Sequence, residues 1–236
     1  MEARPGGADA RLVLCYHAVS ATWPWRYAVA PGALEAQVRS LLEHGFRPVT
    51  FVELVAGSPD ERLLAITFDD GYRSVAERAL PLLDRLAAPA TAFVCPGLVE
   101  ERALRLSRTD WIATGAAAEI EPMGWAELRR LRDAGWEIGS HTRTHPRLTE
   151  LGDAALAAEL AGSSADIERE LGAPCPSLAY PFGDHDDRVV TAAAAAGYSQ
   201  AAIAGSARRR RPPERLRWPR LVVTRGRDPA RLCGGR

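Results

Sequence analysis

Short apolar runs alternate with amphipathic stretches along most of the chain. Seven runs have the length and the apolar content typical of buried strands. They lie at 12–17, 63–70, 90–96, 136–142, 177–183, 199–203 and 217–224. Between several of these runs, apolar residues recur every three to four positions and glycines stand at several ends, which predicts helices. The clearest predicted helices are 34–45, 74–88, 125–135 and 153–172.

This alternation predicts α/β architecture with a mainly parallel sheet or barrel. About seven or eight strand candidates in 236 residues favour an irregular (β/α)7-type barrel with a single domain. Periodicity alone leaves an open, doubly wound sheet as the alternative. We expect the domain to span 11–225. Residues 1–10 and 226–236, rich in Gly, Pro and Arg, are expected to be loose ends, and 98–123 an insertion over one barrel face.

Charge and cysteine content narrow the function classes only slightly. Thirty basic and thirty acidic residues cancel, and the basic ones are nearly all Arg, which is typical of a high-GC genome. We therefore predict no nucleic-acid partner. The four cysteines are far apart without a CxxC pair, so we expect reduced thiols. The first apolar stretch soon meets Tyr16 and His17, so we expect no signal peptide or membrane span and a cytoplasmic location.

The strongest chemical signal is the pair of carboxylates in Ile66-Thr67-Phe68-Asp69-Asp70-Gly71-Tyr72, at the carboxyl end of an apolar run. Barrel active sites lie at that end of the strands. Burying two adjacent carboxylates raises their pKa, so a bound cation or a shared proton is expected. Alone, this segment could equally be an Asp-Gly turn with solvated acids.

A second signal follows another apolar run, in Ser140-His141-Thr142-Arg143-Thr144-His145-Pro146. Imidazoles four residues apart can bind one metal ion in a helical turn or a compact loop. One carboxylate and two histidines leave coordination positions open for water and substrate. The second carboxylate can then act as general base towards water whose pKa the metal lowers.

TFDDG followed by HTRTH resembles the first two motifs of the polysaccharide deacetylase family, carbohydrate esterase family four. The similarity extends from about Leu12 to about Val223. The resemblance implies that Asp69 is the base and that Asp70, His141 and His145 hold the metal. Zn is the default ion, although Co, Ni, Fe or Mn also suit two histidines and one carboxylate.

The family's third motif, Arg-x-Pro-Tyr/Phe-Gly, corresponds here to Ala179-Tyr180-Pro181-Phe182-Gly183. The resemblance implies that Tyr180, Pro181 and Phe182 form part of the substrate groove and that the Phe182 N–H donates to the oxyanion. The motif's Arg, which tunes the base in many members, is absent. Our candidate replacement is Arg220, with a surface or core-edge role as the alternative.

The family's late Leu-x-His motif, the usual source of the general acid, is also absent because no His follows His185. The opening Cys15-Tyr16-His17-Ala18-Val19 resembles a subgroup with Tyr-His-x-Val, in which the acid lies on the first strand. We therefore predict His17 as general acid. Its alternative is a structural His that caps a barrel strand by hydrogen bonding.

Other histidines and tryptophans have simpler explanations. For His185 we favour a loop beside a helix cap made by Asp184 or Asp186, with substrate contact as the alternative. His44 is expected at a helix end. Four tryptophans near predicted loops are expected to pack, although sugars also stack on such rings. They are Trp23, Trp25, Trp111 and Trp125.

The resemblance thus implies a metal-dependent hydrolase that removes N-acetyl groups from amino sugars in a glycan or glycoconjugate. One alternative keeps the metal site but acts on a small amide that is not a polymer, in a narrow pocket closed by 98–123. Another is an inert carbohydrate-binding protein. The paired presence of base and ligands, Asp69 with Asp70, His141 and His145, argues against an inert protein.

Overall fold

The computed structural model describes residues 11–101, 117–205, 214–227 and 229. Eight parallel strands form its main sheet in the order β1-β10-β9-β8-β7-β6-β5-β4. Because β1 also pairs along all of β5, the seven strands from β1 to β5 in this order close into a barrel. The strands are β1 Arg11–Tyr16, β4 Arg47–Val49, β5 Leu63–Phe68, β6 Thr91–Val94, β7 Glu137–Ser140, β8 Ser177–Ala179, β9 Gln200–Gly205 and β10 Trp218–Val222.

The predicted (β/α)7-type barrel is therefore confirmed, and the open sheet is excluded by closure between β1 and β5. The eighth strand, β4, pairs with the first three residues of β5, whereas β6 pairs with the last two. Strands β4 and β6 therefore pair with different parts of the same edge of β5, and β4 is not one of the seven strands of the closed barrel. All seven predicted strands are present, and β4 was not predicted.

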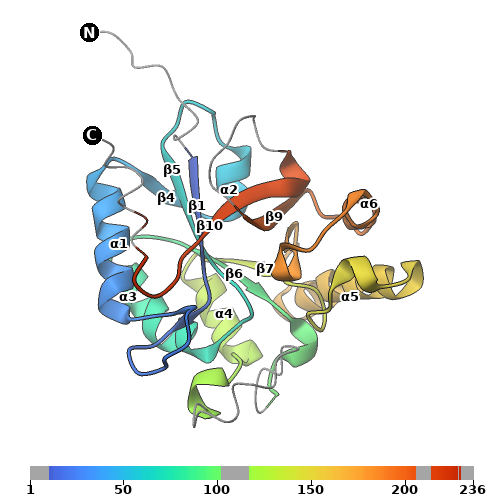
Figure 1. Cartoon of the computed structure of the whole chain (residues 1–236), viewed down its shortest axis with the longest axis horizontal. Coiled ribbons are helices and arrows are strands. Elements are labelled where there is room, and N and C mark those ends of the chain that lie inside the picture. Colours follow the sequence, from blue (N-terminus) through green and yellow to red (C-terminus); the bar gives the residue numbers. More distant parts are fainter. Residues whose placement is uncertain (1–10, 102–116, 206–213, 228, 230–236) are drawn as a thin grey trace.

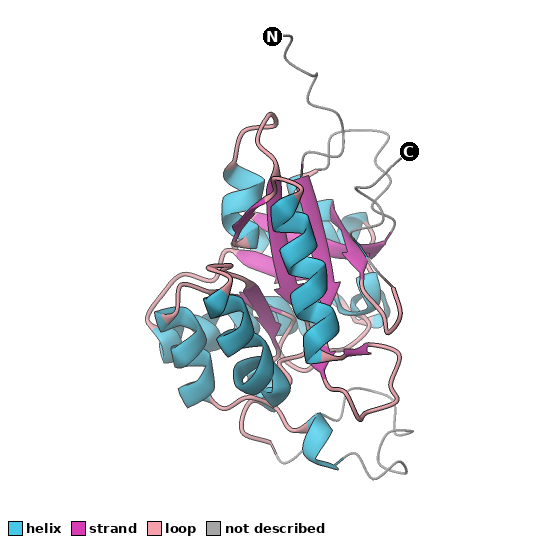
Figure 2. Ribbon diagram, turned by 90° about the vertical axis from the view of Figure 1, so that its left-hand side faces the viewer, coloured by secondary structure: helices cyan, strands magenta, loops and turns pink. Residues whose placement is uncertain are grey.

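Helices form the outer layer, as Figures 1 and 2 show. They are α1 Pro31–Glu43, α2 Phe51–Ala56, α3 Leu80–Arg85, α4 Trp125–Asp133, α5 Asp153–Leu171 and α6 Asp187–Ala195. The four predicted helices correspond to α1, α3, α4 and α5, whereas α2 and α6 were not predicted. The helix predicted at 74–88 begins as a π-helical turn, η1 Val75–Ala79, because Pro81 has no N–H to donate within a regular helix.

Alternating residues of each strand face two different parts of the core. Strand β5 is buried throughout, as expected for a strand covered on both faces. Ala65 belongs to the cluster inside the barrel, whereas Leu64, Ile66 and Phe68 belong to the larger cluster between strands and helices. This alternation fixes which strand residues can reach the barrel axis and so build a site there.

Helix α2 closes the end of the barrel where the strands begin. Phe51, Leu54 and Val55 pack into the interior cluster with residues such as Phe93. The helix starts at a capping box in which Thr50 and Glu53 bond each other's backbone N–H groups. With this end filled, the opposite end is available for chemistry.

The connections at that opposite end are short turns and loops. A two-stranded pair, β2 Ala18–Val19 and β3 Ala28–Val29, frames the loop 20–27. The short turns at this end are η2 Pro96–Leu98, η4 Ala117–Ile120, η5 Leu148–Glu150 and η6 Pro181–Gly183, whereas η7 Arg215–Arg217 leads into the start of β10. Of the predicted insertion 98–123, positions 102–116 lie outside the described residues. The predicted loose ends also lie outside them, apart from 226, 227 and 229.

Candidate metal and catalytic site

Side chains capable of catalysis meet at the end of the barrel where the strands finish. Asp69 and Asp70 follow β5, His141 follows β7, and His17 follows β1. Parallel strands present their carboxyl ends at one rim, so residues far apart in the chain become neighbours there. The distance from Asp69 Oδ2 to His141 Nε2 is 4.0 Å. The structure therefore brings the predicted base and the predicted metal ligands together.

Four non-glycine residues of this region have positive φ angles. They are Asp70 (74°), Thr142 (63°), His145 (66°) and Phe182 (60°). This conformation costs an L-residue about 1–2 kcal/mol and persists only where the surrounding structure enforces it. Gly71, at φ 85°, continues the turn after Asp70 without that cost. Strain of this kind gathers at functional sites, which agrees with the chemistry of these side chains.

Asp70, His141 and His145 form a compact group of potential metal ligands. Asp70 Oδ1 lies 3.5 Å from His141 Nε2 and 3.4 Å from His145 Nε2. All three residues are buried. The segment that carries both histidines is a compact loop, the second of the two conformations expected for this spacing. Two imidazole nitrogens and a carboxylate oxygen so close together fit a divalent transition metal.

Contacts around the ligand group orient the two imidazoles differently. His141 Nδ1 lies 2.7 Å from the Ala179 carbonyl oxygen, and donation through this nitrogen leaves the Nε2 lone pair facing Asp70. His145 Nδ1 is buried and has no hydrogen-bond partner in the described part of the chain. Ring contacts hold His145, with centroids 4.8 Å from His141 and 4.7 Å from Phe182.

The electrostatics of this group suit a cation. Burial alone would raise the pKa of Asp70, but the neighbouring histidines outweigh it and hold the carboxyl ionised. Burial lowers the pKa of His145 to about 4, which leaves a neutral imidazole. For His141, burial is outweighed by Asp69 and Asp70, which raise its pKa. A metal ion would take the place of the proton that these carboxylates favour on His141.

Arg220 holds Asp69 in a bidentate ion pair. Its NH1 donates to Asp69 Oδ1 at 2.6 Å and its NH2 donates to Asp69 Oδ2 at 2.7 Å, while NH1 also reaches Thr67 Oγ1 at 3.0 Å. Arg220 has no exposed surface. Burial opposes the charge on Asp69, but the guanidinium outweighs it and lowers the pKa of the carboxyl well below its usual range. Arg220 is therefore a buried partner of Asp69 and not a surface or core-edge residue, and its role in tuning a base stays a prediction.

Cys15 lies beside the same carboxylate and was not predicted to do so. Its Sγ is 3.4 Å from Asp69 Oδ2. Burial raises the pKa of the Cys15 thiol, so the S–H is retained and can donate to the carboxylate. Cys15 Sγ, one nitrogen of His17 and a carboxylate oxygen of Asp69 lie within 4.8 Å of one another. Because side chains alternate along a strand, Cys15 lies on the inner face of β1. This alternation was the only feature of the sequence that could have indicated its position near Asp69.

His17 lies beside Asp69 and contacts an aromatic wall. Its ring stacks on Tyr27 with centroids 4.8 Å apart and meets Trp25 edge-on at 5.8 Å. His17 Nδ1 is buried and without a hydrogen-bond partner among the described residues, so capping of the strand through this atom is not observed. Burial lowers the pKa of His17, with Asp70 and Asp69 opposing that effect.

The turn η6 places Phe182 at the rim of the site. The Phe182 ring is 42% exposed, and Arg147 Cζ lies 4.5 Å from its centroid. Gly183 has φ 70°, and a Cβ there would lie 2.9 Å from the Ala204 carbonyl oxygen, so only glycine fits this close approach. Pro181 and Tyr180 are buried, and the Tyr180 hydroxyl donates to the Leu216 carbonyl. Pro181 and Tyr180 therefore anchor the turn in the core. Of the three residues predicted to form the groove, only Phe182 is exposed to solvent.

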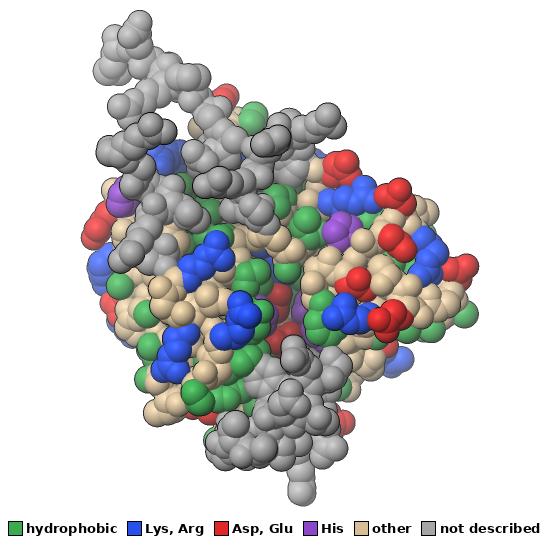
Figure 3. Space-filling view, viewed as in Figure 1, with side chains coloured by type: hydrophobic (Ala, Val, Ile, Leu, Met, Phe, Trp, Pro, Cys, Tyr) green, Lys and Arg blue, Asp and Glu red, His purple; other side chains and the backbone are tan. Residues whose placement is uncertain are grey.

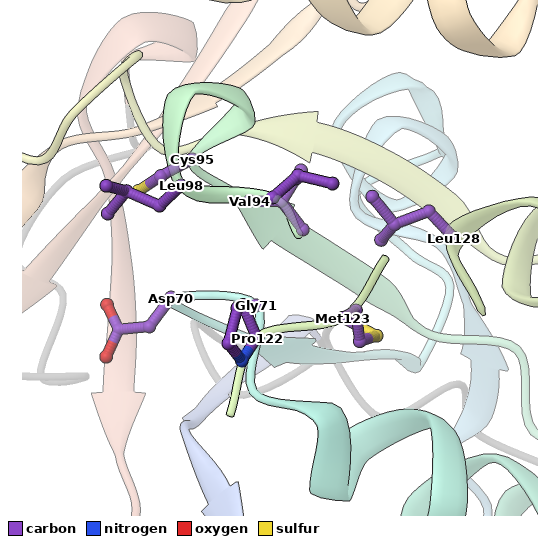
Figure 4. A pocket seen from close by; sticks show the side chains of 9 residues that line it. Asp70, Gly71, Val94, Cys95, Leu98, Pro122, Met123 and Leu128 are labelled. Carbon is purple, nitrogen blue, oxygen red and sulfur yellow. The ribbon is translucent and has the colours of Figure 1, made fainter. Parts of the chain in front are cut away.

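The pocket beside Asp70 in Figure 4 is mainly apolar. The Asp70 carboxylate points away from Met123 and Leu128, while Cys95 and Leu98 lie above it in this view. The pocket has no room for a water molecule. From outside, Figure 3 shows acidic and histidine side chains at the bottom of a hollow near the middle of the molecule.

Other predicted candidates have structural roles. Asp186, not Asp184, caps α6 by accepting a hydrogen bond from the Val189 N–H at 2.8 Å. His185 stacks on Tyr180 at 5.3 Å, and His44 ends α1. Of the tryptophans, Trp23 is buried, Trp25 is half-buried beside His17, and Trp125 begins α4, whereas Trp111 lies outside the described residues.

A sequence model of the polysaccharide deacetylase family matches residues 56–201. The chain belongs to this family. The match covers more than half of the chain and includes Asp69, Asp70, His141, His145 and Phe182, but neither His17 nor Arg220. The familial resemblance seen in the two motifs is thereby confirmed.

Two curated polysaccharide deacetylase relatives show the extent of similarity. The poly-beta-1,6-N-acetyl-D-glucosamine N-deacetylase of Staphylococcus aureus is 24% identical over 174 residues, which cover 68% of this chain and 56% of the relative. A putative polysaccharide deacetylase, YxkH, of Bacillus subtilis is 24% identical over 185 residues, covering 76% and 59%. The aligned part thus spans less than two thirds of these relatives.

Solved structures agree on the fold of this polysaccharide deacetylase. IcaB from Ammonifex degensii superposes with a TM-score of 0.76 at 23% identity, covering 92% of both chains. A polysaccharide deacetylase from Bacillus cereus gives a TM-score of 0.74 at 25% identity, covering 91% of this chain and 65% of the other. Among the described residues no helix is both long and apolar enough to cross a membrane, and the cytoplasmic location stays a prediction.

Proposed function

We propose that this polysaccharide deacetylase is a metal-dependent hydrolase that removes N-acetyl groups from N-acetylated amino sugars in glycans or glycoconjugates. The products are acetate and a free amine. The single observation that carries the proposal is the ion-paired Asp69 carboxylate lying 4.0 Å from a candidate metal ligand, His141 Nε2. A base held beside a metal site suits hydrolysis, whereas a binding protein needs neither.

Asp70, His141 and His145 would hold the metal through one carboxylate oxygen and two imidazole nitrogens. Zn is the ion we propose first, with Co, Ni, Fe and Mn compatible with the same donors. A divalent ion at this position supplies a Lewis acid that polarises the acetyl carbonyl and makes water more acidic.

Asp69 accepts a proton from the attacking water as its oxygen bonds to the acetyl carbon. The Arg220 guanidinium keeps Asp69 ionised and fixes the direction of its oxygens. The backbone N–H of Phe182 donates a hydrogen bond to the oxyanion that develops. His17 donates a proton to the nitrogen as the C–N bond breaks, which releases the amine. Burial lowers the pKa of His17, and Asp70 and Asp69 oppose that effect by favouring the protonated imidazole that this step needs.

The sugar substrate class is supported by the activity named for the Staphylococcus aureus relative. In this chain, the exposed Phe182 ring at the rim offers a surface on which a sugar ring can stack. Pro181 and Tyr180 are buried and anchor the turn that carries Phe182.

The function is tested by measuring acetate release from N-acetylated sugars, from monosaccharide to polymer, with and without a chelator. We expect release from at least one amino sugar, loss of release after chelation, and recovery when Zn²⁺ is restored. Release only from a small non-sugar amide would replace the sugar substrate. No release from any N-acetylated compound by metal-loaded protein would contradict the proposal.

A further inference from the structure

One wall of the hollow is built by the loop 20–27. Tyr27 stacks on His17, and Arg26 Cζ in turn lies 4.8 Å from the Tyr27 ring centroid. Arg26 is exposed. The Tyr27 ring therefore lies between the Arg26 guanidinium and His17, the candidate general acid.

A second wall, built by residues after β7 and β8, repeats this arrangement with different residues. Phe182 contacts His145, and Arg147 Cζ lies 4.5 Å from the Phe182 ring centroid. Arg147 is also exposed. Each of the two histidines thus contacts an aromatic ring that carries a guanidinium.

These guanidiniums lack the carboxylate partner that most arginines in the described part of the chain have. Most arginines in the described part of the chain form an ion pair with a carboxylate. Within that same part, neither Arg26 nor Arg147 has a carboxylate partner. Their charges remain available to a ligand.

Arg225 is bound to the loop that carries Arg26. The Arg225 N–H donates to the Arg26 carbonyl at 2.7 Å, and the Arg225 guanidinium donates to the carbonyls of Ala21 and Trp23. Arg227 follows two residues later, and its guanidinium donates to a carbonyl at 2.9 Å. None of these contacts neutralises charge. Arg225 therefore adds a positive charge to this loop through contacts with backbone carbonyls.

We propose that the substrate carries an anionic group, a phosphate ester or a carboxylate, close to its N-acetylated sugar. Figure 3 shows basic side chains on both sides of the hollow that contains the acidic and histidine residues. Because the chain has no net charge, this is a local concentration of positive charge and not a general property of the surface. Guanidinium groups pair well with phosphate and carboxylate oxygens. The proposal rests on the deacetylase function proposed above.

Four probes form matched pairs for the test. N-acetylglucosamine 1-phosphate is compared with N-acetylglucosamine, and an oligosaccharide alternating N-acetylglucosamine with glucuronate is compared with a chitooligosaccharide of equal length. Acetate release gives kcat and KM. Calorimetric titration of an Asp69→Asn protein gives Kd without turnover, so the binding preference can be measured even if no probe is deacetylated.

Arg26→Gln and Arg147→Gln are the test variants because both guanidiniums lie over aromatic rings. Arg62→Gln is the matched control, since Arg62 is exposed and stacks on Phe46 in the same manner at a distance of 4.6 Å. For an anionic probe we expect each test variant to raise Kd and KM by about three- to tenfold, with kcat unchanged. The effect should shrink as salt is added.

Neutral probes should be unaffected by these substitutions, and Arg62→Gln should leave all four probes unchanged. Preference for the phosphate or for the uronate probe identifies which source of negative charge the site accepts. Equal affinity for charged and neutral members of both pairs would overturn the inference. If the substitutions weakened the binding of charged and neutral probes equally, the inference would also be overturned. The arginines would then affect binding only by holding the aromatic rings in place, and not through their charge. If no probe releases acetate but the anionic probes still bind more tightly than the neutral ones, the deacetylase proposal fails while the inference about the anionic group stands.

Discussion

At the scale of single residues, the carboxylate of Asp69, the proposed base, is enclosed by protein side chains and has little contact with solvent. Both Asp69 oxygens accept from Arg220, and Oδ2 also accepts from the Cys15 thiol. A carboxylate so enclosed remains ionised and fixed in direction. Its value as a base then depends on the guanidinium staying in place.

Replacing Arg220 tests this dependence. Arg220→Met leaves Asp69 as a buried charge without its partner, so we expect a loss of about 3–5 kcal/mol in the free energy of unfolding. Because the ion pair lowers the pKa of Asp69, its stabilisation is present above the usual value of 3.8 and is lost as pH falls through the lower folded-state value. Removing Arg220 should also move the acid limb of the kcat/KM profile to higher pH.

Chemical denaturation across pH measures the stability change. Arg39→Met is the control, because Arg39 pairs with Glu35 on the exposed surface of α1 and should contribute less than about 1 kcal/mol. Similar losses for the two variants would contradict the stabilising role of the buried pair.

His17→Ala removes the proposed general acid without removing a metal ligand. We expect kcat to fall by about 100- to 10,000-fold while bound metal per chain is unchanged. Steady-state acetate release and metal analysis by mass spectrometry measure the two quantities. Loss of metal together with activity would instead make His17 a ligand or a structural residue.

The sequence alone predicted the identities of the site residues well. It predicted their individual contacts less well. Adjacent carboxylates and spaced histidines at strand ends are local signals, and Asp69, Asp70, His141 and His145 do meet. Arg220 was named as a candidate partner of the base only through the family resemblance, because its pairing with Asp69 joins residues 151 positions apart and depends on barrel closure. The contacts of Cys15 and Tyr27 depend on the same three-dimensional arrangement.

At the scale of secondary-structure elements, the buried carboxylate of Glu137 ties several elements together at the start of β7. Glu137 Oε2 accepts from the Val52 N–H of α2 and from the Thr91 hydroxyl of β6, each at 2.9 Å. Oε1 accepts from the Ser177 hydroxyl of β8. This network lies at the beginning of the strand whose other end carries His141.

Glu137 should make stability depend on pH in the opposite sense to Asp69. Burial raises the pKa of Glu137 despite these donors. The stability that it contributes relative to Glu137→Gln should therefore be complete below its usual pKa of 4.5 and decline as pH rises through the folded-state value. Thermal unfolding of both proteins from acid to neutral pH measures the difference. A difference that grows with pH would mean that folding lowers the pKa of Glu137 and would contradict the prediction.

Long elements were predicted well because each contains several turns or a continuous buried run. Helix α5 has 19 residues, whereas α2 has six, little more than one turn, and was missed. Strand β4 has three residues and contains a proline, so it has little periodic signal. Helix α6 was missed although Asp186 was recognised as a candidate cap.

At the scale of the whole molecule, the proposed metal ligands come from turns that follow two different strands. Asp70 and the two histidines are separated by about seventy residues of chain and meet because β6 pairs with both β5 and β7 in the folded sheet. A metal ion should therefore bind the folded state far better than the unfolded chain. Binding then stabilises the fold.

We expect added Zn²⁺ to raise Tm by about 5–10 °C at a free concentration near 100 times Kd. Differential scanning calorimetry of chelated and Zn²⁺-loaded protein measures the shift. The control is a protein carrying Asp70→Ala and His141→Ala, in which the shift should vanish. A shift that persists in this control would place the stabilising ion elsewhere.

The most direct test of the proposed mechanism compares Asp69→Asn with the wild type after both are loaded with metal. Metal content and acetate release from the best N-acetylated sugar are measured on the same samples, with Asp84→Asn on the exposed surface of α3 as control. We predict close to one metal ion per chain in all three proteins, and acetate release only in the wild type and the control. Release at the wild-type rate from Asp69→Asn would contradict the assignment of Asp69 as the base.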